Sequence, residues 1–246
     1  MLFISPPFGN YVWLPNTISI TGSFTLYPRE GKWKQIFRTL RYSWKYGCWC
    51  NKIGLRNPGI EYAIQQYAMK KNTITSVAIL NAEDIEPLVK KIPTTMNIEL
   101  NISCPNTDHA MVSDNIDRFI HSDRKYCIVK LSPLDTMDRV DRLYSQGFRQ
   151  FHCSNTLPIK ELSDCKYEGG MSGSILIPYT VSLVKQIRTR YPDTEIIAGG
   201  GVQDHKIKNR YIKLGANHIS ISTLCFHPIK FSIFYGKWLY ELFIQS

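Results

Sequence analysis

The residues best suited to chemistry follow short apolar runs in the middle of the chain. Asn101–Asn106 (NISCPN) follows one run, Lys130 lies within the next, and Ser154-Asn155-Thr156 ends a third. Side-chain amides both donate and accept hydrogen bonds, and lysine is almost never buried without a partner. Two later turns, Gly199–Gly201 and Ser222-Thr223, could hold a phosphate through backbone N–H groups. Together these residues predict a phosphate-bearing cofactor and a flat, polar, amide-like substrate.

The elements that must position these residues alternate between β-rich runs and segments of helical spacing. The predicted strands are Leu2–Ser5, Ile18–Thr25, Ser76–Leu80, Asn97–Ile102, Cys127–Leu131, Phe151–Ser154, Glu195–Gly199 and His218–Ile221. The predicted helices include Asn57–Lys71, Ala82–Lys91, Thr136–Gln146, Tyr179–Arg190 and Asp204–Leu214, the last with Asp204 as N-cap and Gly215 after its end. Eight strands with intervening helices predict an α/β fold, a (β/α)8 TIM barrel forming a single domain over residues 1–246. A doubly wound open sheet is the alternative, because it shows the same alternation.

The first crossover is short for a barrel. Only Pro6–Thr17 separates the first two predicted strands, and this segment contains three prolines. A parallel connection needs about a dozen residues. We therefore expect either that the first outer helix is missing or that the first strand lies outside the barrel.

Several motifs in a fixed order carry a family resemblance. They are Asn51–Asn57 (NKIGLRN), Asn101–Asn106 (NISCPN), Ile128–Pro133 (IVKLSP), Asn155-Thr156, Gly169–Gly173 (GGMSG) and Ile196–Val202 (IIAGGGV). From about Ile18 to about Thr223 the sequence resembles the dihydroorotate dehydrogenases, FMN-dependent barrels of pyrimidine synthesis. The hexapeptide with the downstream lysine strand is the specific part, whereas the glycine turns alone are weak evidence.

The resemblance implies a role for each matching position. Cys104 falls where the soluble, cysteine-base class of the family places the catalytic base, which removes a proton from C5 of dihydroorotate while hydride leaves C6 for flavin N5. Lys130 falls where a lysine contacts the flavin, and a cation there would stabilise the reduced ring. A thiol suits the base role only if its pKa is lowered toward the working pH.

Further positions are implied to bind substrate and cofactor. The asparagines Asn51, Asn101, Asn106 and Asn155 match those that hydrogen-bond the pyrimidine ring and its carboxylate, with Thr156 beside them. Asn155 is also expected at the cofactor. Around the FMN ribityl phosphate the matching residues are Gly170, Gly173, Gly200, Gly201, Ser222 and Thr223.

The sequence also departs from the family pattern. The second strand normally carries a lysine at the flavin and substrate face, and Gly22 stands there in this chain. The last phosphate turn normally has Gly-Thr and here has Ser222-Thr223, so a Cβ limits the approach of the backbone to a phosphate. The first helix is also missing from the N-terminal crossover.

Composition limits the other classes of protein. The chain has 246 residues, 43% of them hydrophobic, and seven cysteines, which predicts a globular protein with reduced thiols rather than a disulfide framework. No signal peptide or spanning helix is evident, so we expect a cytoplasmic protein without a membrane anchor. Cys48-Trp49-Cys50 lacks a second pair at ligand spacing, and we predict no metal site.

The net charge of +10 is concentrated in one aromatic segment. Residues 29–56 contain Arg29, Lys32, Lys34, Arg38, Arg41, Lys45, Lys52 and Arg56, interleaved with Trp33, Phe37, Tyr42, Trp44, Tyr46 and Trp49. We favour a solvated flap that attracts an anionic substrate over nucleic-acid contact. Pro228–Phe243 is expected to be the last barrel helix, with a homodimer or membrane-surface contact as its alternative role.

Three functions follow from these observations. The first is FMN-dependent oxidation of dihydroorotate to orotate. The second is a flavin enzyme that reduces uridine in tRNA, which shares the barrel and suits the charge pattern but does not need the asparagine set. The third is a degenerate barrel without catalysis, suggested by Gly22 and Ser222. The electron acceptor is not indicated by the sequence.

Overall fold

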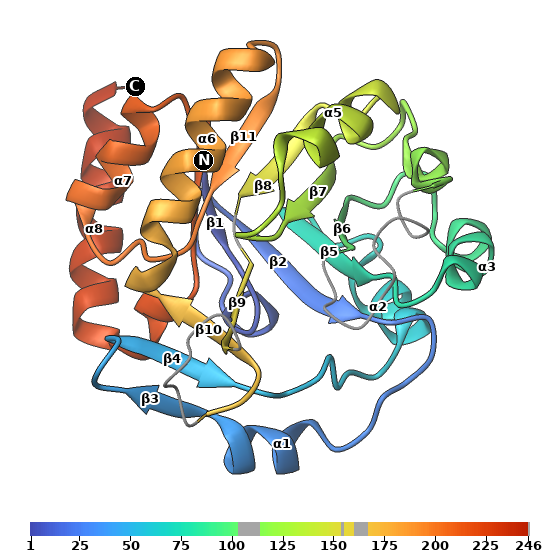
Figure 1. Ribbon diagram of the computed structural model, residues 1–246, viewed down its shortest axis with the longest axis horizontal. Coiled ribbons are helices and arrows are strands. Elements are labelled where there is room, and N and C mark those ends of the chain that lie inside the picture. The colour runs from blue at the N-terminus through green and yellow to red at the C-terminus, as the bar shows by residue number, and fades with distance from the viewer. Residues whose placement is uncertain (103–113, 154, 160–166, 246) are drawn as a thin grey trace.

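Eight parallel strands close into a barrel, with helices around its outside (Figure 1). The structure is a computed structural model that describes residues 1–102, 114–153, 155–159 and 167–245. The barrel strands are β1 (Leu2–Ile4), β2 (Thr17–Phe24), β5 (Thr73–Ala78), β6 (Ile98–Asn101), β7 (Cys127–Leu131), β8 (Gln150–Cys153), β11 (Glu195–Ala198) and β12 (His218–Ile221). All eight predicted strands are present, although β5 begins three residues earlier than expected. The closed order β1-β12-β11-β8-β7-β6-β5-β2 confirms the TIM barrel over the open sheet.

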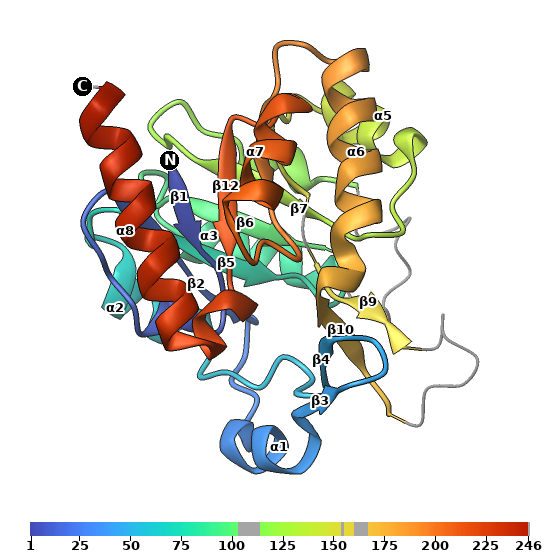
Figure 2. The same cartoon turned by 90° about the vertical axis from the view of Figure 1, so that its left-hand side faces the viewer.

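Helices follow most of the barrel strands and cover their outer side (Figures 1 and 2). They are α2 (Ile60–Tyr67), α3 (Ile85–Lys91), α5 (Met137–Ser145), α6 (Ile177–Arg190), α7 (His205–Lys213) and α8 (Pro228–Gln245). Short 3-10 turns supplement them at η2 (Ala82–Asp84), η3 (Ile116–Phe119), η5 (Ser174–Leu176) and η6 (Thr223–Phe226). As predicted, the Asp204 side chain caps α7 by accepting the backbone N–H of Ile207 at 2.9 Å. No described helix has both the length and the apolar composition needed to cross a membrane.

The first strand belongs to the barrel although its crossover has no α-helix. β1 pairs with both β2 and β12, and the connection contains only the 3-10 turn η1 (Phe8–Asn10). Gly9 in this turn is buried, and a Cβ there would collide with the backbone carbonyls of Ile4 and Ile20. The absence of a side chain thus lets the turn lie directly on the strands, which is how so short a segment closes the barrel.

A second, antiparallel sheet lies beside the barrel and was not predicted. Its strands are β3 (Arg41–Ser43), β4 (Cys48–Asn51), β10 (Gly170–Gly173) and β9 (Leu157–Pro158), in the order β3-β4-β10-β9. The short helix α1 (Lys32–Thr39) precedes it at the same end of the molecule (Figure 1). Trp49 of β4 stacks on Phe226 of η6 at a centroid distance of 4.4 Å and so ties this sheet to the barrel.

The buried side chains form an outer and an inner core. The larger cluster lies between the strands and the surrounding helices, and Phe151, Val184 and Phe234 belong to it. A smaller cluster fills the barrel interior with Phe3, Ile18, Ile20, Ile74, Tyr126, Ile128 and Ile197. Successive side chains of a strand point to opposite faces, so the residues two positions after these also point into the barrel, nearer the carboxyl ends. That layer is polar, and it forms the candidate site.

Candidate active site

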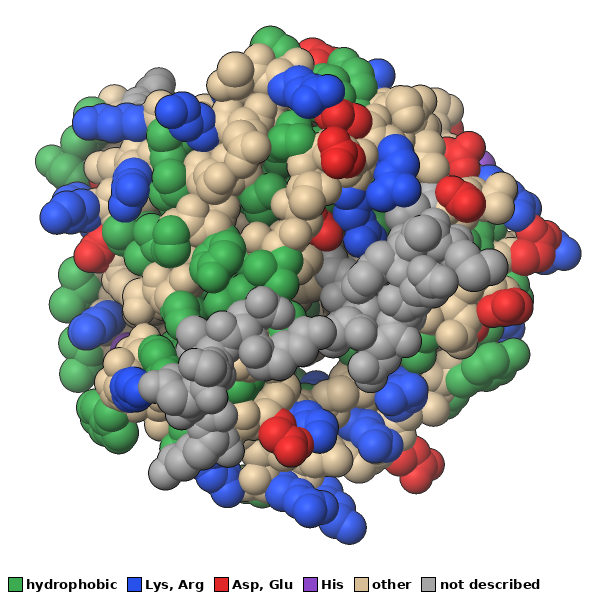
Figure 3. All heavy atoms as spheres, viewed as in Figure 1, with side chains coloured by type: hydrophobic (Ala, Val, Ile, Leu, Met, Phe, Trp, Pro, Cys, Tyr) green, Lys and Arg blue, Asp and Glu red, His purple; other side chains and the backbone are tan. Residues whose placement is uncertain are grey.

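A cleft opens at the carboxyl ends of β1, β7, β8, β11 and β12. It encloses about 510 Å³, including its open mouth. Its walls are formed by Ser5, Pro6, Lys130, Asn155, Thr156, Ser172, Gly173, Leu176, Gly200, Gly201, Val202, Ser220, Ile221, Ser222 and Thr223. Of the predicted cofactor residues, all but Gly170 contribute to these walls. Figure 3 shows this side of the molecule with a hollow near its centre and Lys and Arg side chains gathered below it, over α1.

The turn after β11 approaches its neighbours too closely for a side chain. Gly200 and Gly201 have φ values of +80° and +73°, which favour glycine. A Cβ on Gly201 would lie 2.6 Å from Ile177 of α6, and one on Gly200 would lie 2.9 Å from Leu176. The turn therefore presents backbone to the cleft, as a phosphate-binding loop requires.

In the turn after β12, the side chain of Ser222 forms a hydrogen bond within the protein. Ser222 has an extended φ of −148°, so the position does not demand glycine. Its hydroxyl donates a hydrogen bond to the carbonyl oxygen of Pro6 at 2.8 Å. This bond links the end of the last strand to the segment after the first, on the wall of the cleft.

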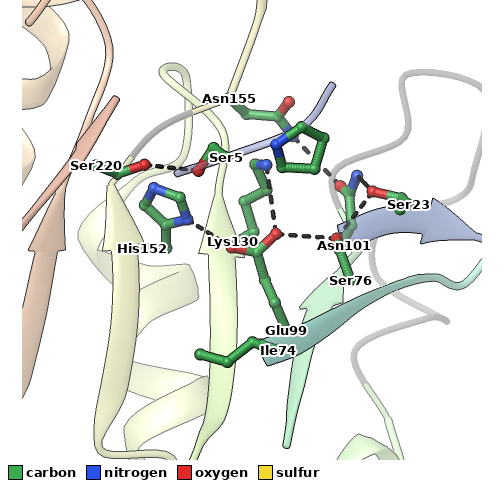
Figure 4. A network of polar contacts seen from close by, with 12 residues as sticks. Ser5, Ser23, Ile74, Ser76, Glu99, Asn101, Lys130, His152, Asn155 and Ser220 are labelled. Carbon is green, nitrogen blue, oxygen red and sulfur yellow. Dashed lines mark hydrogen bonds and ion pairs between the residues drawn. The ribbon is translucent and has the colours of Figure 1, made fainter. Parts of the chain in front are cut away.

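Two of the predicted asparagines meet at the end of the barrel (Figure 4). Asn155 donates to the side-chain oxygen of Asn101 at 3.3 Å, and Asn101 donates to Ser23 at 3.1 Å. Asn101 is 9% exposed and lies opposite Lys130 in the register of β6 and β7. The backbone N–H of Thr156 also donates to the Asn155 side chain, at 2.9 Å. These contacts fix both amides beside the lysine.

Lys130 lies in a buried charge network whose other members were not predicted (Figure 4). Its ammonium is 3.3 Å from Glu99 Oε1, and the two side chains are 11% and 0% exposed. Glu99 also accepts a hydrogen bond from Ser76 at 2.9 Å, and its other oxygen lies 2.5 Å from His152 Nδ1. The strand register explains the grouping, because Glu99 pairs with Ser76 while Lys130 pairs with His152.

The electrostatics of this network follow from burial and charge. Burial alone would raise the pKa of Glu99, but Lys130, His152 and Ser76 outweigh it and lower that pKa to about 2. Burial lowers the pKa of His152, and the neighbouring Glu99 opposes this shift only in part. Glu99 is therefore ionised and His152 neutral at neutral pH. The sequence signal for both was a polar residue alternating with apolar ones in a buried strand, in ELN and in FHC.

Gly22 lies near the end of β2, where the backbone conformation and its neighbours leave no room for a side chain. Its φ is +106°, and a Cβ would lie 2.6 Å from the carbonyl oxygen of Ser76. The next residue, Ser23, bonds to Ser76 Oγ at 2.8 Å and accepts the Asn101 amide. A hydroxyl therefore contacts the network on the strand where the family pattern has a cation.

Two predicted residues lie in the second sheet rather than on the cleft walls. Asn51 of β4 pairs with Gly170 of β10, and neither lines the cleft. A Cβ on Gly170 would lie 2.5 Å from the hydroxyl of Thr156, which does line it. Gly170 therefore packs against Thr156 behind the cleft wall, and its expected role at the cofactor stays a prediction. Cys104 and Asn106 lie outside the described residues.

The described cysteines around the barrel are poor candidates for a base. Burial raises the pKa of Cys127 to about 11 and the pKa values of Cys153 and Cys225 to about 12. Cys48 and Cys50 are fully buried in the apolar cluster under the second sheet. Within the described part of the chain, no group of three or more His, Cys, Asp or Glu side chains could hold a metal ion.

Comparison with known proteins identifies the family. The sequence profile described as dihydroorotate dehydrogenase matches residues 13–232. The catalytic subunit of dihydroorotate dehydrogenase B (NAD(+)) from Petrotoga mobilis is 30% identical over 84% of this chain and 75% of its own length. The corresponding subunit from Thermotoga petrophila is 25% identical over 98% of this chain and 99% of its own length.

A solved structure agrees with the fold. The crystal structure of DHODH from Eimeria tenella in complex with ferulenol superposes with a TM-score of 0.65 at 17% identity, covering 86% of this chain and 70% of that one. At this identity the likeness concerns the fold alone. The family profile covers far more than half of the sequence, and the chain therefore belongs to the dihydroorotate dehydrogenase family, oxidoreductases that act on CH–CH bonds.

Proposed function

We propose that this protein oxidises dihydroorotate to orotate in pyrimidine biosynthesis, with FMN as the electron acceptor in the cleft. The observation that carries the proposal is the paired amides of Asn101 and Asn155 beside Lys130, at the edge of a cleft walled by glycine turns. Amide groups that donate and accept complement a pyrimidine ring edge, which alternates N–H and C=O groups. Family membership supports the same substrate.

The residues present suit FMN as the resident group. The turn at Gly200 and Gly201 leaves no room for side chains and offers backbone N–H groups to a phosphate. Gly173, Ser222 and Thr223 line the same wall, and Lys130 reaches it from the barrel interior. When bound, FMN would accept the hydride from C6 of the substrate at N5. The protein residues then hold the substrate and exclude water from the transfer.

Cys104 is the proposed base that takes the proton from C5. In the sequence it comes three residues after Asn101, the last residue of β6 and the proposed substrate-binding amide. The thiols of Cys127, Cys153 and Cys225 are held protonated by burial and do not compete for the role. Asn106 is proposed as a further contact to the substrate, and Asn51 as one contributed by the second sheet.

The first test is the visible absorption spectrum of the purified protein, before and after anaerobic addition of dihydroorotate. A flavin spectrum that bleaches establishes the cofactor and the substrate together. Cys104→Ala should slow the bleaching by at least about a hundredfold, the usual contribution of a general base, while the half-buried Cys127→Ala should bleach at the wild-type rate. Unchanged bleaching in Cys104→Ala would remove the thiol from the mechanism. A flavin that stays oxidised would redirect the search toward uridine in RNA.

A further inference from the structure

A histidine beneath the cleft has no part in the chemistry proposed above. His152 of β8 is 0% exposed, and its Nδ1 lies 2.5 Å from Glu99 Oε2. Its other ring nitrogen, Nε2, is buried and has no hydrogen-bond partner among the described residues. Figure 4 shows this nitrogen on the side of the ring that faces Ser5 and Ser220, whose hydroxyls are 2.6 Å apart and line the cleft.

The hydrogen bond to Glu99 assigns the tautomer of the ring. An ionised carboxylate only accepts hydrogen bonds, so the hydrogen must lie on Nδ1. Burial lowers the pKa of His152, which leaves the ring neutral at neutral pH. Nε2 therefore carries a free lone pair and can accept a proton.

Among the residues that the structure describes, the charged side chains of this network sum to zero charge. Glu99 on β6 carries one negative charge and Lys130 on β7 one positive charge, at 3.3 Å from each other. The other described polar groups of this layer are the hydroxyls of Ser5 at the end of β1, Ser76 on β5 and Ser220 on β12, and the amides of Asn101 and Asn155 beside Lys130. The next layer inward is apolar and includes Ile74, Ile128 and Ile197. Lys130 is thus already neutralised by Glu99 before any charge develops in the cleft.

Hydride transfer disturbs this balance. The C6–H bond of the substrate breaks and its hydrogen moves to the cofactor as hydride, while the C5 proton goes to the base and from the base to solvent. Once that proton has left, the cleft holds one more negative charge than before. Lys130 is close but already paired with Glu99, so the extra charge favours protonation of a neighbouring group that can become positive.

We propose that His152 Nε2 is a proton-binding site coupled to reduction in the cleft. The ring takes one proton from solvent when hydride adds its negative charge, and returns it when the electrons leave. The protonated ring still donates from Nδ1 to Glu99, and the three side chains then sum to one positive charge beneath the reduced cofactor. His152 acts here as a positioning residue through charge, and the inference rests on the proposed FMN chemistry.

The test follows the ring directly in the FMN-loaded protein. Histidine-selective ¹⁵N labelling and NMR at neutral pH report whether each ring is neutral or doubly protonated, before and after anaerobic reduction. We expect one ring, assigned by its loss in His152→Gln, to change from the neutral Nδ1–H form to the doubly protonated form. A pH-indicator dye in weak buffer should show about one proton fewer taken up per two electrons in His152→Gln than in the wild type. Glutamine can still donate to Glu99 but cannot take the proton.

The outcomes separate this inference from the function itself. His121→Gln, a change of an exposed histidine, should take up as many protons as the wild type. If FMN binds and bleaches while the His152 ring stays neutral, or if His152→Gln takes up the wild-type number of protons, the coupling is wrong and the function stands. A protein that binds no FMN overturns both. Should His152→Gln fail to fold, His→Gln variants of the other five histidines assign the His152 signal by elimination, and the wild-type NMR spectra then decide the question.

Discussion

The charged side chains of the site are buried in the barrel and stabilise one another. Glu99 is fully buried, and its carboxylate is stabilised by Lys130, His152 and Ser76 together. Removing one member of a buried ion pair leaves the other charge without compensation, which costs more than the pair contributes. Lys130 was predicted from the sequence to be a site residue, because a lysine in an apolar strand is almost never buried without a partner. Its partner Glu99 was not, because a sequence does not show which strands are neighbours at which register.

Lys130→Met should lower the free energy of unfolding by about 3–5 kcal/mol at neutral pH. In the wild type the pKa of Glu99 is lowered to about 2. Its contribution to stability is therefore complete above the unfolded pKa of about 4.3 and is lost as pH falls toward the folded value. Without Lys130 the folded pKa should rise, so that the deficit of the variant shrinks as the solution is acidified below about pH 4.

Urea denaturation at neutral and at acidic pH measures that deficit. Lys185→Met, which replaces an exposed lysine of α6, should unfold like the wild type throughout. A deficit that is the same at every pH would mean that Lys130 stabilises the protein through packing and not through its charge.

At the scale of elements, periodicity identified the barrel strands but not the second sheet. The eight barrel strands are apolar or β-branched runs, and their burial matches that pattern. The strands of the second sheet are only two to four residues long and join segments more than a hundred residues apart, such as Asn51 and Gly170. Their sequences, RYS, CWCN, LP and GMSG, lack the apolar or β-branched runs of the barrel strands, so long-range pairing forms them rather than local sequence. For this reason Asn51 and Gly170 could be matched to a family pattern but not placed.

Alanine substitution at two glycines, one in the 3-10 turn η1 and one in the helix α8, should change the stability of the protein in opposite directions. Gly9→Ala should destabilise the protein strongly, because the added Cβ meets the carbonyls of Ile4 and Ile20 and lifts η1 from the strands. Gly236→Ala should stabilise it by about 0.5–1 kcal/mol, because Gly236 lies within α8 with open space around it and alanine is the better helix former. Thermal unfolding of both variants gives the two signs.

Gly236→Ala also tests the homodimer contact that was the alternative role of the last helix. Ile229, Ile233 and Tyr240 of α8 are each more than 60% exposed, at spacings that place them on the side of Gly236. If a second copy packed there, alanine at Gly236 would obstruct the contact and lower the melting temperature in a concentration-dependent way. Stabilisation at every protein concentration would instead leave α8 as an outer barrel helix alone.

For the molecule as a whole, closure of the barrel depends on its shortest strand, β1. β1 has three residues, yet it is the strand between β2 and β12. Its central residue Phe3 is fully buried in the inner core and contacts the Tyr126 ring edge-on at 6.0 Å. The sequence left open whether this strand belonged to the barrel, because a twelve-residue crossover without a helix suits either answer. In the structure the strand belongs to the barrel, because the side chain of Phe3 is needed to fill the inner core.

Phe3→Ala should therefore lower the free energy of unfolding of the whole barrel by about 3–5 kcal/mol, the usual cost of a large cavity in a core. Phe37→Ala, at a position 76% exposed on α1, should change it by less than about 0.5 kcal/mol. Amide exchange shows how the loss is distributed, because Ser5 N–H donates to Ile221 across the β1–β12 junction at 2.8 Å. If β1 is integral to the closed sheet, Phe3→Ala will accelerate exchange in β6 and β7 as much as at this junction, since they open together only on global unfolding. Acceleration confined to the amides of β1 and its two neighbours would instead show that β1 opens by itself, and that the other seven strands hold the site without it.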